Sequence, residues 1–215
     1  MGERANDSGT TAGSPGEDMP QPGEEELLWT VAAAMRRLGP LASMAQIARE
    51  AGLSPAALYR RFPTPDLLRE RLAEAFYERL LAHARQALSR PADQRLRHFL
   101  GAVGLHLALG HGVLPGTFGE MAAPGQREHL YALAADLLEQ CKEEGVVSAD
   151  VALSDLVGVV WGLRGVIAAT DGIAPDAWER YLDVAVAGLR NPEVSFGRPP
   201  LGPELLDRVI TRPSR

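Results

Sequence analysis

The sequence predicts an all-α protein. Its longest segments are rich in alanine and leucine, and their apolar residues recur at the three- and four-residue spacing of amphipathic helices. Glycine and proline separate these segments, and no alternating runs rich in valine or isoleucine and bounded by turn residues occur. With 215 residues and 46% hydrophobic content, the chain can bury a sizeable core in one large or two small domains.

The first predicted helix covers residues 24–38. Three glutamates open it and Arg36 and Arg37 close it, which is the sense that the helix dipole favours. Six apolar residues form its buried stripe: Leu27, Leu28, Val31, Ala34, Met35 and Leu38. Residues 1–23 are rich in glycine, serine, threonine, proline and acidic residues, so we expect a disordered N-terminal extension.

Residues 43–62 predict two short helices joined by a tight turn. Ser43 and Gln46 have the spacing of a capping box, which starts the first helix. Gly52 follows the last periodic residue, where a left-handed glycine ends a helix. Ser54 and Pro55 then supply the N-cap and first-turn proline of the second helix. The segment is therefore a helix-turn-helix.

The helix-turn-helix as a whole has two faces. An apolar stripe faces the domain interior and comprises Ile47, Ala48, Ala51, Leu53, Leu58 and Phe62. On the other face lie Ala56, Tyr59, Arg60 and Arg61. Small side chains permit close approach to a groove, and a phenol with guanidinium groups suits phosphate oxygens and guanine edges.

The segment resembles the TetR family of bacterial transcription regulators. The residues that carry the resemblance are Ile47-Ala48, Ala51-Gly52-Leu53-Ser54, Leu58-Tyr59 and Phe62, followed by a helix that starts near Thr64. The resemblance implies that DNA is contacted by Ser43, Ala45, Pro55, Ala56, Ala57, Tyr59, Arg60 and Arg61. The family usually has a phosphate-binding lysine where this chain has Pro65, so we expect that phosphate contact either to be weaker or to be made by Arg61 or Arg69.

The charge distribution fits a local DNA contact. The formal net charge is −6, yet residues 30–72 contain seven arginines against three acidic residues. A basic face on an acidic body attracts phosphate where it docks and discourages adhesion elsewhere. Arg36 and Arg37 are equally consistent with backbone contacts and with compensation of the helix dipole.

The resemblance also implies the domain organisation. It places a three-helix helix-turn-helix DNA-binding domain at residues 24–64 and a larger helical ligand-binding and dimerisation domain at 65–190. The remaining residues, 191–215, form a C-terminal tail with a possible short helix at 203–210. Within the body, apolar periodicity and caps predict helices at 65–89, 91–110, 126–144, 148–170 and 175–189, with a short irregular helix between 112 and 125.

Two sets of residues in the body follow from the resemblance. The segments that line the ligand pocket in the family carry here Phe99, His106, Phe118, Met121, Tyr131, Trp161 and Arg164. Arg164 lies among apolar neighbours, so it needs a ligand anion, Asp155 or Asp171 as a partner. The two last helices pair with their twins in the family, which predicts a homodimer interface of Gly158, Gly162, Gly165, Trp178, Tyr181, Leu182 and Ala185.

Other classes of site find little support. His98, His106 and His111 lack metal-ligand spacing, and Cys141 is the only cysteine, which fits a buried residue in a reducing compartment. No nucleophile, base and orienting group occur at recognisable spacing, so we expect no enzyme and no cofactor. Because no secretion signal or membrane-length apolar stretch free of glycine and charge occurs, we expect a cytoplasmic protein without membrane contact.

The sequence therefore predicts a ligand-responsive transcriptional regulator. We expect a homodimeric repressor that leaves a palindromic double-stranded operator when a small apolar or aromatic effector binds. Two alternatives stay open: a helical dimeric interaction or ligand-binding module without DNA binding, and a small helical enzyme.

Overall fold

The computed structural model describes residues 23–39, 41–111, 113, 124–191 and 196–210, and every regular element in these ranges is a helix. The all-α prediction is confirmed. The helices are α1 (Glu24–Leu38), α2 (Met44–Glu50), α3 (Pro55–Arg61), α4 (Pro65–Leu88), α5 (Ala92–Gly110), α6 (Pro124–Glu143), α7 (Leu153–Thr170), α8 (Ala177–Arg190) and α9 (Pro203–Ile210).

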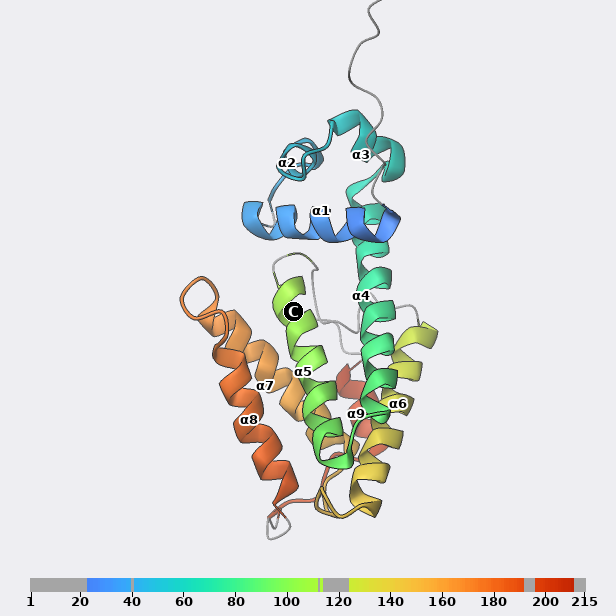
Figure 1. The fold of residues 1–215 in the computed structure, drawn as a ribbon, viewed down its shortest axis with the longest axis vertical. Helices are drawn as coiled ribbons and strands as arrows, with labels where there is room; N and C mark the ends of the chain where they lie inside the picture. Colours follow the sequence, from blue (N-terminus) through green and yellow to red (C-terminus); the bar gives the residue numbers. More distant parts are fainter. Residues whose placement is uncertain (1–22, 40, 112, 114–123, 192–195, 211–215) are drawn as a thin grey trace, which may run out of the picture.

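The first three helices form a small head at one end of the molecule. Helix α1 crosses the start of α4, and α2 and α3 lie on the far side of α1 (Figure 1). A separate hydrophobic cluster fills the head, with Val31 of α1, Ala48 of α2 and Leu58 of α3 at its centre. The apolar stripes predicted for these helices therefore meet in one core, except that Leu38, which was predicted to be buried, is 39% exposed at the end of α1.

Helix α4 belongs to both parts of the molecule. It has 24 residues and is therefore about 36 Å long. Leu68 and Leu72, near its start, are buried in the core of the head, whereas Leu80 and Ala84 are buried in the core of the body. One continuous helix therefore joins the core of the head to the core of the body.

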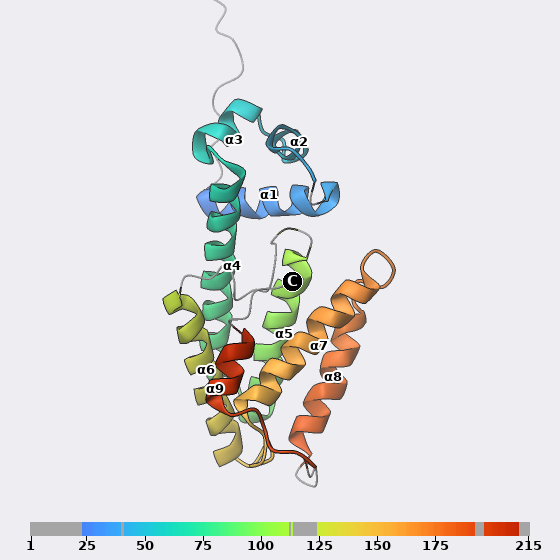
Figure 2. The same cartoon turned by 180° about the vertical axis from the view of Figure 1, so that it is seen from behind.

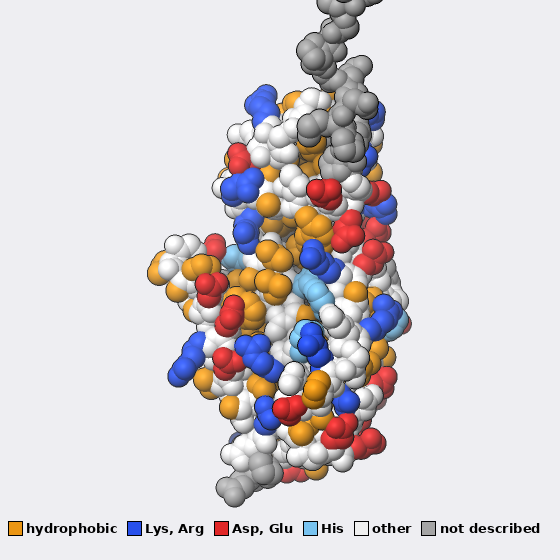
Figure 3. All heavy atoms as spheres, in the orientation of Figure 1, with side chains coloured by type: hydrophobic (Ala, Val, Ile, Leu, Met, Phe, Trp, Pro, Cys, Tyr) orange, Lys and Arg blue, Asp and Glu red, His pale blue; other side chains and the backbone are white. Residues whose placement is uncertain are grey.

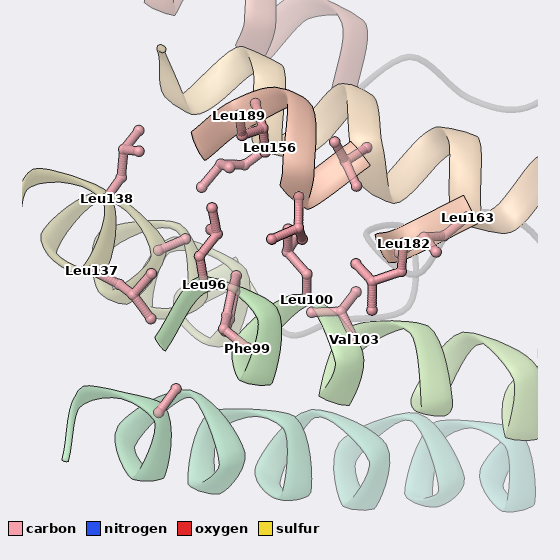
Figure 4. Packing of buried hydrophobic residues seen from close by; sticks show 14 of the residues in the cluster. Leu96, Phe99, Leu100, Val103, Leu137, Leu138, Leu156, Leu163, Leu182 and Leu189 are labelled. Carbon is pink, nitrogen blue, oxygen red and sulfur yellow. The ribbon is translucent and has the colours of Figure 1, made fainter. Parts of the chain in front are cut away.

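Helix α5 is the centre of the body. Leu96, Phe99, Leu100 and Val103 project from it towards α6, α7 and α8, and α4 runs along its other side (Figure 4). Two glycines allow close helix contacts: the ring of Trp178 on α8 packs against Gly104 of α5, and Tyr181 of α8 packs against Gly162 of α7. Both glycines are places where a side chain would collide with an aromatic ring.

The C-terminal segment forms a helix on the body. Figure 2 shows α9 lying across the back of the molecule between α6 and α7. Leu206 is buried there, while Leu205 and Val209 stay about half exposed. The helix predicted at 203–210 is therefore present, and it packs on the body.

The starts of three helices differ from the sequence prediction by two residues or more: α6 begins at Pro124 instead of 126, α7 at Leu153 instead of 148, and α8 at Ala177 instead of 175. Helix α7 begins at Leu153, because residues 148–151 form a turn in which the Val151 N–H donates to the Ser148 carbonyl at 3.1 Å. Val147 and Val151 are buried beside this turn, and the Asp155 carboxylate accepts from the Ala152 N–H at 2.8 Å. Most of the irregular helix expected between 112 and 125, and the extension at 1–22, lie outside the described residues.

Candidate nucleic-acid interface and ligand cavity

The N-terminus of α2 has the predicted capping box. The Ser43 hydroxyl accepts from the Gln46 backbone N–H at 3.3 Å, and the Gln46 side-chain oxygen accepts from the Ser43 backbone N–H at 2.9 Å. The hydroxyl also donates to the same Gln46 oxygen at 2.8 Å. Both polar groups of Ser43 therefore hold α2 in position.

The turn between α2 and α3 has the geometry that the sequence predicts. Gly52 has a φ of +73°, which an L side chain rarely adopts. The Leu53 N–H donates to the Ala48 carbonyl at 2.8 Å, which closes α2, and the Ser54 hydroxyl accepts from the Ala57 N–H at 3.1 Å, which opens α3. These bonds set the direction in which α3 leaves the turn.

Helix α3 presents the expected outer face. Leu58 and Phe62 are buried, and Tyr59 is 45% exposed. Arg60 and Arg61 are exposed beside Tyr59. Of the smaller residues predicted to contact DNA, Ala56 is exposed, and Ala45, Pro55 and Ala57 are half-buried. A groove that meets α3 would encounter the phenol and the two guanidinium groups first.

Ion pairs divide the arginines of this region into two groups. Arg37 pairs with Glu50 at 2.6 Å, Arg69 with Asp66 at 3.0 Å, and Arg71 with both Glu24 and Glu74. Within the described ranges the other four make no ion pair: Arg36, Arg49, Arg60 and Arg61. Figure 3 shows Lys and Arg side chains (blue) projecting from the head, with Asp and Glu side chains (red) among them, and mixed charges on the body.

The body contains a partly open cavity of about 240 Å³. Helices α4, α5, α6, α7 and α9 all contribute to its wall, and the wall is mostly aliphatic. The lining residues are Tyr77, Leu80, Phe99, Leu100, Val103, Leu107, Arg127, Leu130, Tyr131, Ala134, Leu153, Leu156, Val157, Val160, Trp161, Arg164, Val209 and Ile210. A concave apolar site with a few polar groups is the usual form of a small-molecule site.

Four of the seven residues predicted to bind ligand line this cavity: Phe99, Tyr131, Trp161 and Arg164. Phe118 and Met121 lie outside the described residues. The two carboxylates weighed as partners of Arg164 have other contacts, since Asp155 caps α7 and Asp171 lies 3.7 Å from His111. Burial raises the pKa of the Tyr77 and Tyr131 phenols, so both are neutral hydroxyl donors near pH 7.

The prediction for His106 is wrong. Its side chain is absent from the cavity wall and is 1% exposed between α4 and α5, where its ring contacts Phe76 and His83. Its Nδ1 lies 2.7 Å from the Ala102 carbonyl oxygen, the acceptor one turn earlier. Burial lowers the pKa of His106 to about 4, against the effect of that hydrogen bond. His106 is thus a neutral core residue near pH 7.

Three of the residues predicted for the dimer interface serve inside the protomer. Trp178 and Leu182 are buried in the body core, and Gly162 lies under the Tyr181 ring, so these predictions are corrected. The face of α8 that contains Trp178, Leu182 and Leu189 packs on the core of its own protomer, whereas Val184 is exposed. Gly158 and Gly165 are exposed, and Tyr181 and Ala185 are half-buried.

An exposed apolar surface remains on α7 and α8. It contains Gly158, Gly165, Trp161 at 39% exposure and Val184 at 60% exposure, and we call it the α7–α8 face. Helix α7 is long and apolar enough to cross a membrane by length and composition, but only 33% of that window is buried in the protomer. The apolar surface of α7 is thus only partly covered by its own chain.

Several cavity residues were missed by the sequence reasoning. Tyr77 of α4 and Arg127 of α6 were not among the predicted ligand residues, and Val209 and Ile210 belong to a tail whose position the sequence left undecided. The alternation of apolar and charged residues at 203–210 was the available signal for α9, but it did not reveal which surface α9 covers. Within the described residues no three His, Cys, Asp or Glu side chains gather as they do at a metal site.

Comparisons with known proteins agree with this arrangement. A family model described as "Bacterial regulatory proteins, tetR family" matches residues 39–72, and one described as "Transcriptional regulator SbtR-like, C-terminal domain" matches residues 91–191. No curated protein is significantly similar to the chain.

Solved structures share the fold. The TetR transcriptional regulator SCO0520 from Streptomyces coelicolor is 22% identical with a TM-score of 0.59, over 78% of this chain and 98% of that chain. The TetR transcription regulatory protein from Mycobacterium vanbaalenii is 25% identical with a TM-score of 0.53, over 77% and 93%. PfmR from Thermus thermophilus is 21% identical with a TM-score of 0.56, over 77% and 99%.

Proposed function

Because this chain belongs to the TetR family of bacterial transcriptional regulators, we propose that it acts as a homodimeric repressor that a small, largely apolar effector releases from a palindromic operator. The observation that carries the proposal is that α4 belongs to both the DNA-binding head and the cavity wall. One end of this helix is buried in the core of the DNA-binding head, and the other supplies Tyr77 and Leu80 to the cavity wall. An effector in the cavity therefore contacts the helix that positions the head.

In this proposal α3 enters the major groove. Tyr59 holds a phosphate through its hydroxyl, and Arg60 reads a base edge, since a guanidinium group donates in the bidentate geometry that suits guanine. Arg61 takes the phosphate contact that the missing lysine at position 65 makes in relatives. Arg69 is the weaker choice for that contact because Asp66 already accepts from it at 3.0 Å.

We propose that the α7–α8 face is the dimer interface. Gly158 and Gly165 have no atom within 4 Å of where a Cβ would lie, so the helices of a second protomer could approach their backbones closely. Val184 and Trp161 on the same face are apolar and exposed. A four-helix bundle of two α7–α8 pairs would cover them, and the two α3 helices would face successive major grooves.

Release follows from linkage. The two heads must be spaced by about 34–36 Å, or a multiple, to meet grooves on one side of the DNA. An effector that prefers a dimer with another spacing shifts the population towards it, and DNA affinity falls by the same factor by which DNA weakens effector binding. Since its target is chromosomal DNA, the protein acts in the cytoplasm.

The DNA part of the proposal is tested by selecting genomic duplexes that the purified protein binds and measuring the salt dependence of binding. We expect a palindromic site and an affinity that falls steeply with salt. Tyr59→Phe should weaken binding to all sequences alike, whereas Arg60→Ala should cost about 1–3 kcal/mol and relax the preference at one base of each half-site. Arg97→Ala, on the body, is the control.

Failure to bind any palindromic genomic duplex would overturn the proposal in favour of a helical dimer without DNA binding. Unchanged base preference in Arg60→Ala would refute the role of Arg60 alone.

The dimer part is tested with Val184→Glu, which places two carboxylates in the apolar interface. Light scattering should show a monomer, and operator binding should fall with it, because a single head makes half of the contacts. Val184→Thr has nearly the same shape without a charge and should stay dimeric. A Val184→Glu protein that is dimeric at micromolar concentration would exclude the α7–α8 face.

A further inference from the structure

The cavity has a polar end and an apolar end. Helix α4 runs away from the head, so its polar lining residue Tyr77 lies nearer to the head than Leu80 (Figure 1). Helix α6 runs in the same direction, and Arg127 and Tyr131 precede Ala134. Helix α7 runs the opposite way, towards the head, and there the polar residue follows the aliphatic ones.

On α7 the aliphatic lining residues occupy 153–160 and Arg164 comes one turn later (Figure 2). Tyr77, Arg127, Tyr131 and Arg164, the four polar residues of the wall, therefore all lie towards the head. They come from two helices that run away from the head, α4 and α6, and one that runs towards it, α7. The far end, towards the tip of the body, is lined by aliphatic residues of α5, α6 and α7, including Leu100, Ala134 and Leu156.

The polar end consists of hydrogen-bond donors. Arg127 and Arg164 carry positive charge, and the wall residues that the structure describes include no carboxylate, although the negative charge of Asp207 on α9 acts on the nearby Tyr131. The positive charge of Arg127 lies close enough to both phenols to act on their titration, which places Tyr77, Tyr131 and Arg127 together. Two guanidinium groups beside two phenol hydroxyls match an anion with several acceptor oxygens.

The volume limits the size of the occupant. At about 30 Å³ per water-sized group, 240 Å³ holds about eight such groups. This suits one aromatic ring or a medium-length alkyl chain with a head group.

We propose that the effector is a small amphipathic monocarboxylate, with its head group bound by Arg127 and Arg164 and its apolar part directed away from the head of the protein. The planar guanidinium groups match a carboxylate in bidentate geometry. The inference rests on the proposed function, because it identifies the ligand class of the same cavity. It also explains the coupling: the carboxylate binds beside Tyr77, on the helix that enters the DNA-binding head.

The test compares octanoate with octanamide, which have the same chain and differ in charge. Binding to the full-length protein is measured by calorimetry and by the fluorescence of Trp161, which lines the cavity. We expect octanoate to bind at least tenfold more tightly than octanamide. Arg127→Met and Arg164→Met should each weaken octanoate binding about tenfold and leave octanamide binding unchanged, which also shows that the variants are folded. Arg97→Met, whose side chain pairs with Asp183 on the surface, should bind like the unaltered protein.

Equal binding of octanoate and octanamide, or no binding of octanoate at millimolar concentration, overturns the inference. So does an octanoate affinity that survives both arginine substitutions. In a series from butanoate to hexadecanoate we expect an optimum near eight carbons, and a steady gain with length would contradict the size limit. A protein that prefers octanoate but binds no palindromic duplex refutes the proposed repressor function and leaves the ligand class standing.

Discussion

Substitution of Gly104 by alanine tests the central packing of the body. A Cβ at this position would lie 2.6 Å from Cε3 of Trp178, closer than carbon atoms approach without displacement. Trp178 is only 6% exposed, and its helix is also held by the buried Leu182 and Leu189, so the rigid ring has little freedom to move. Gly104 therefore permits the contact between α5 and α8.

Two effects of opposite sign determine how much Gly104→Ala changes the free energy of unfolding. Alanine in a helix interior is about 0.5–1 kcal/mol more favourable than glycine. An added methyl group in a tightly packed core costs about 1–3 kcal/mol. Because the collision is with a buried ring, we expect the cost to prevail and Gly104→Ala to lower the free energy of unfolding by about 1–2 kcal/mol.

Gly101→Ala is the matched control, one turn earlier on the same helix. Its Cβ would lie 3.3 Å from the end of the flexible Arg97 side chain and 3.7 Å from Leu182, so we expect it to stabilise the protein by up to about 1 kcal/mol. Both variants are compared by urea denaturation at one protomer concentration, since dimerisation contributes to stability. A Gly104→Ala protein as stable as Gly101→Ala would refute the packing argument, and Trp178→Leu should partly rescue Gly104→Ala.

Three further predictions concern DNA binding, pH and α9. Pro65→Lys restores a donor at the start of α4, so operator affinity should rise and the salt dependence should steepen by about one unit per protomer, measured by titration at several salt concentrations. The pKa of His106 is lower in the folded than in the unfolded protein, so the contribution of neutral His106 to the free energy of unfolding is complete above about pH 6.5. That contribution should fall by about 3 kcal/mol as the pH drops towards about 4. His106→Gln should remove much of this loss in denaturation curves at pH 7 and pH 4.5, although His83 and Arg79 stay nearby; an unchanged pH dependence would argue against a neutral His106. Leu206→Asp should detach α9 and reduce the thermal stabilisation by octanoate, with little effect on operator binding; full retention of that stabilisation would exclude α9 from the ligand site.

The DNA-reading surface and the ligand cavity should differ in how well they tolerate substitutions. The reading surface consists of exposed side chains on a short helix, so substitutions at Arg60 or Arg61 should alter binding without unfolding the head. The cavity is built into the body core, and residues such as Phe99 and Leu100 both line it and hold α5 in place. Variants aimed at the effector are therefore best confined to the polar end.

The sequence by itself determined the DNA-binding head. Its caps and turn depend on residues close together in the chain: Ser43 with Gln46, Leu53 with Ala48, and Ser54 with Ala57. Such local hydrogen bonds leave a pattern of residue types at fixed spacing, which is why the boundaries of α2 and α3 and the outer face of α3 were predicted correctly.

Only the tertiary structure decided the sites in the body. Periodicity shows that a helix has an apolar face but not whether that face meets its own chain, a cavity or a second protomer. Trp178 and Leu182 are therefore core residues although they were expected at the interface, and His106 lies between α4 and α5 although it was expected in the cavity. The ligand cavity combines Tyr77, Arg164 and Ile210, which are separated by many residues and brought together only by the packing of α4, α7 and α9.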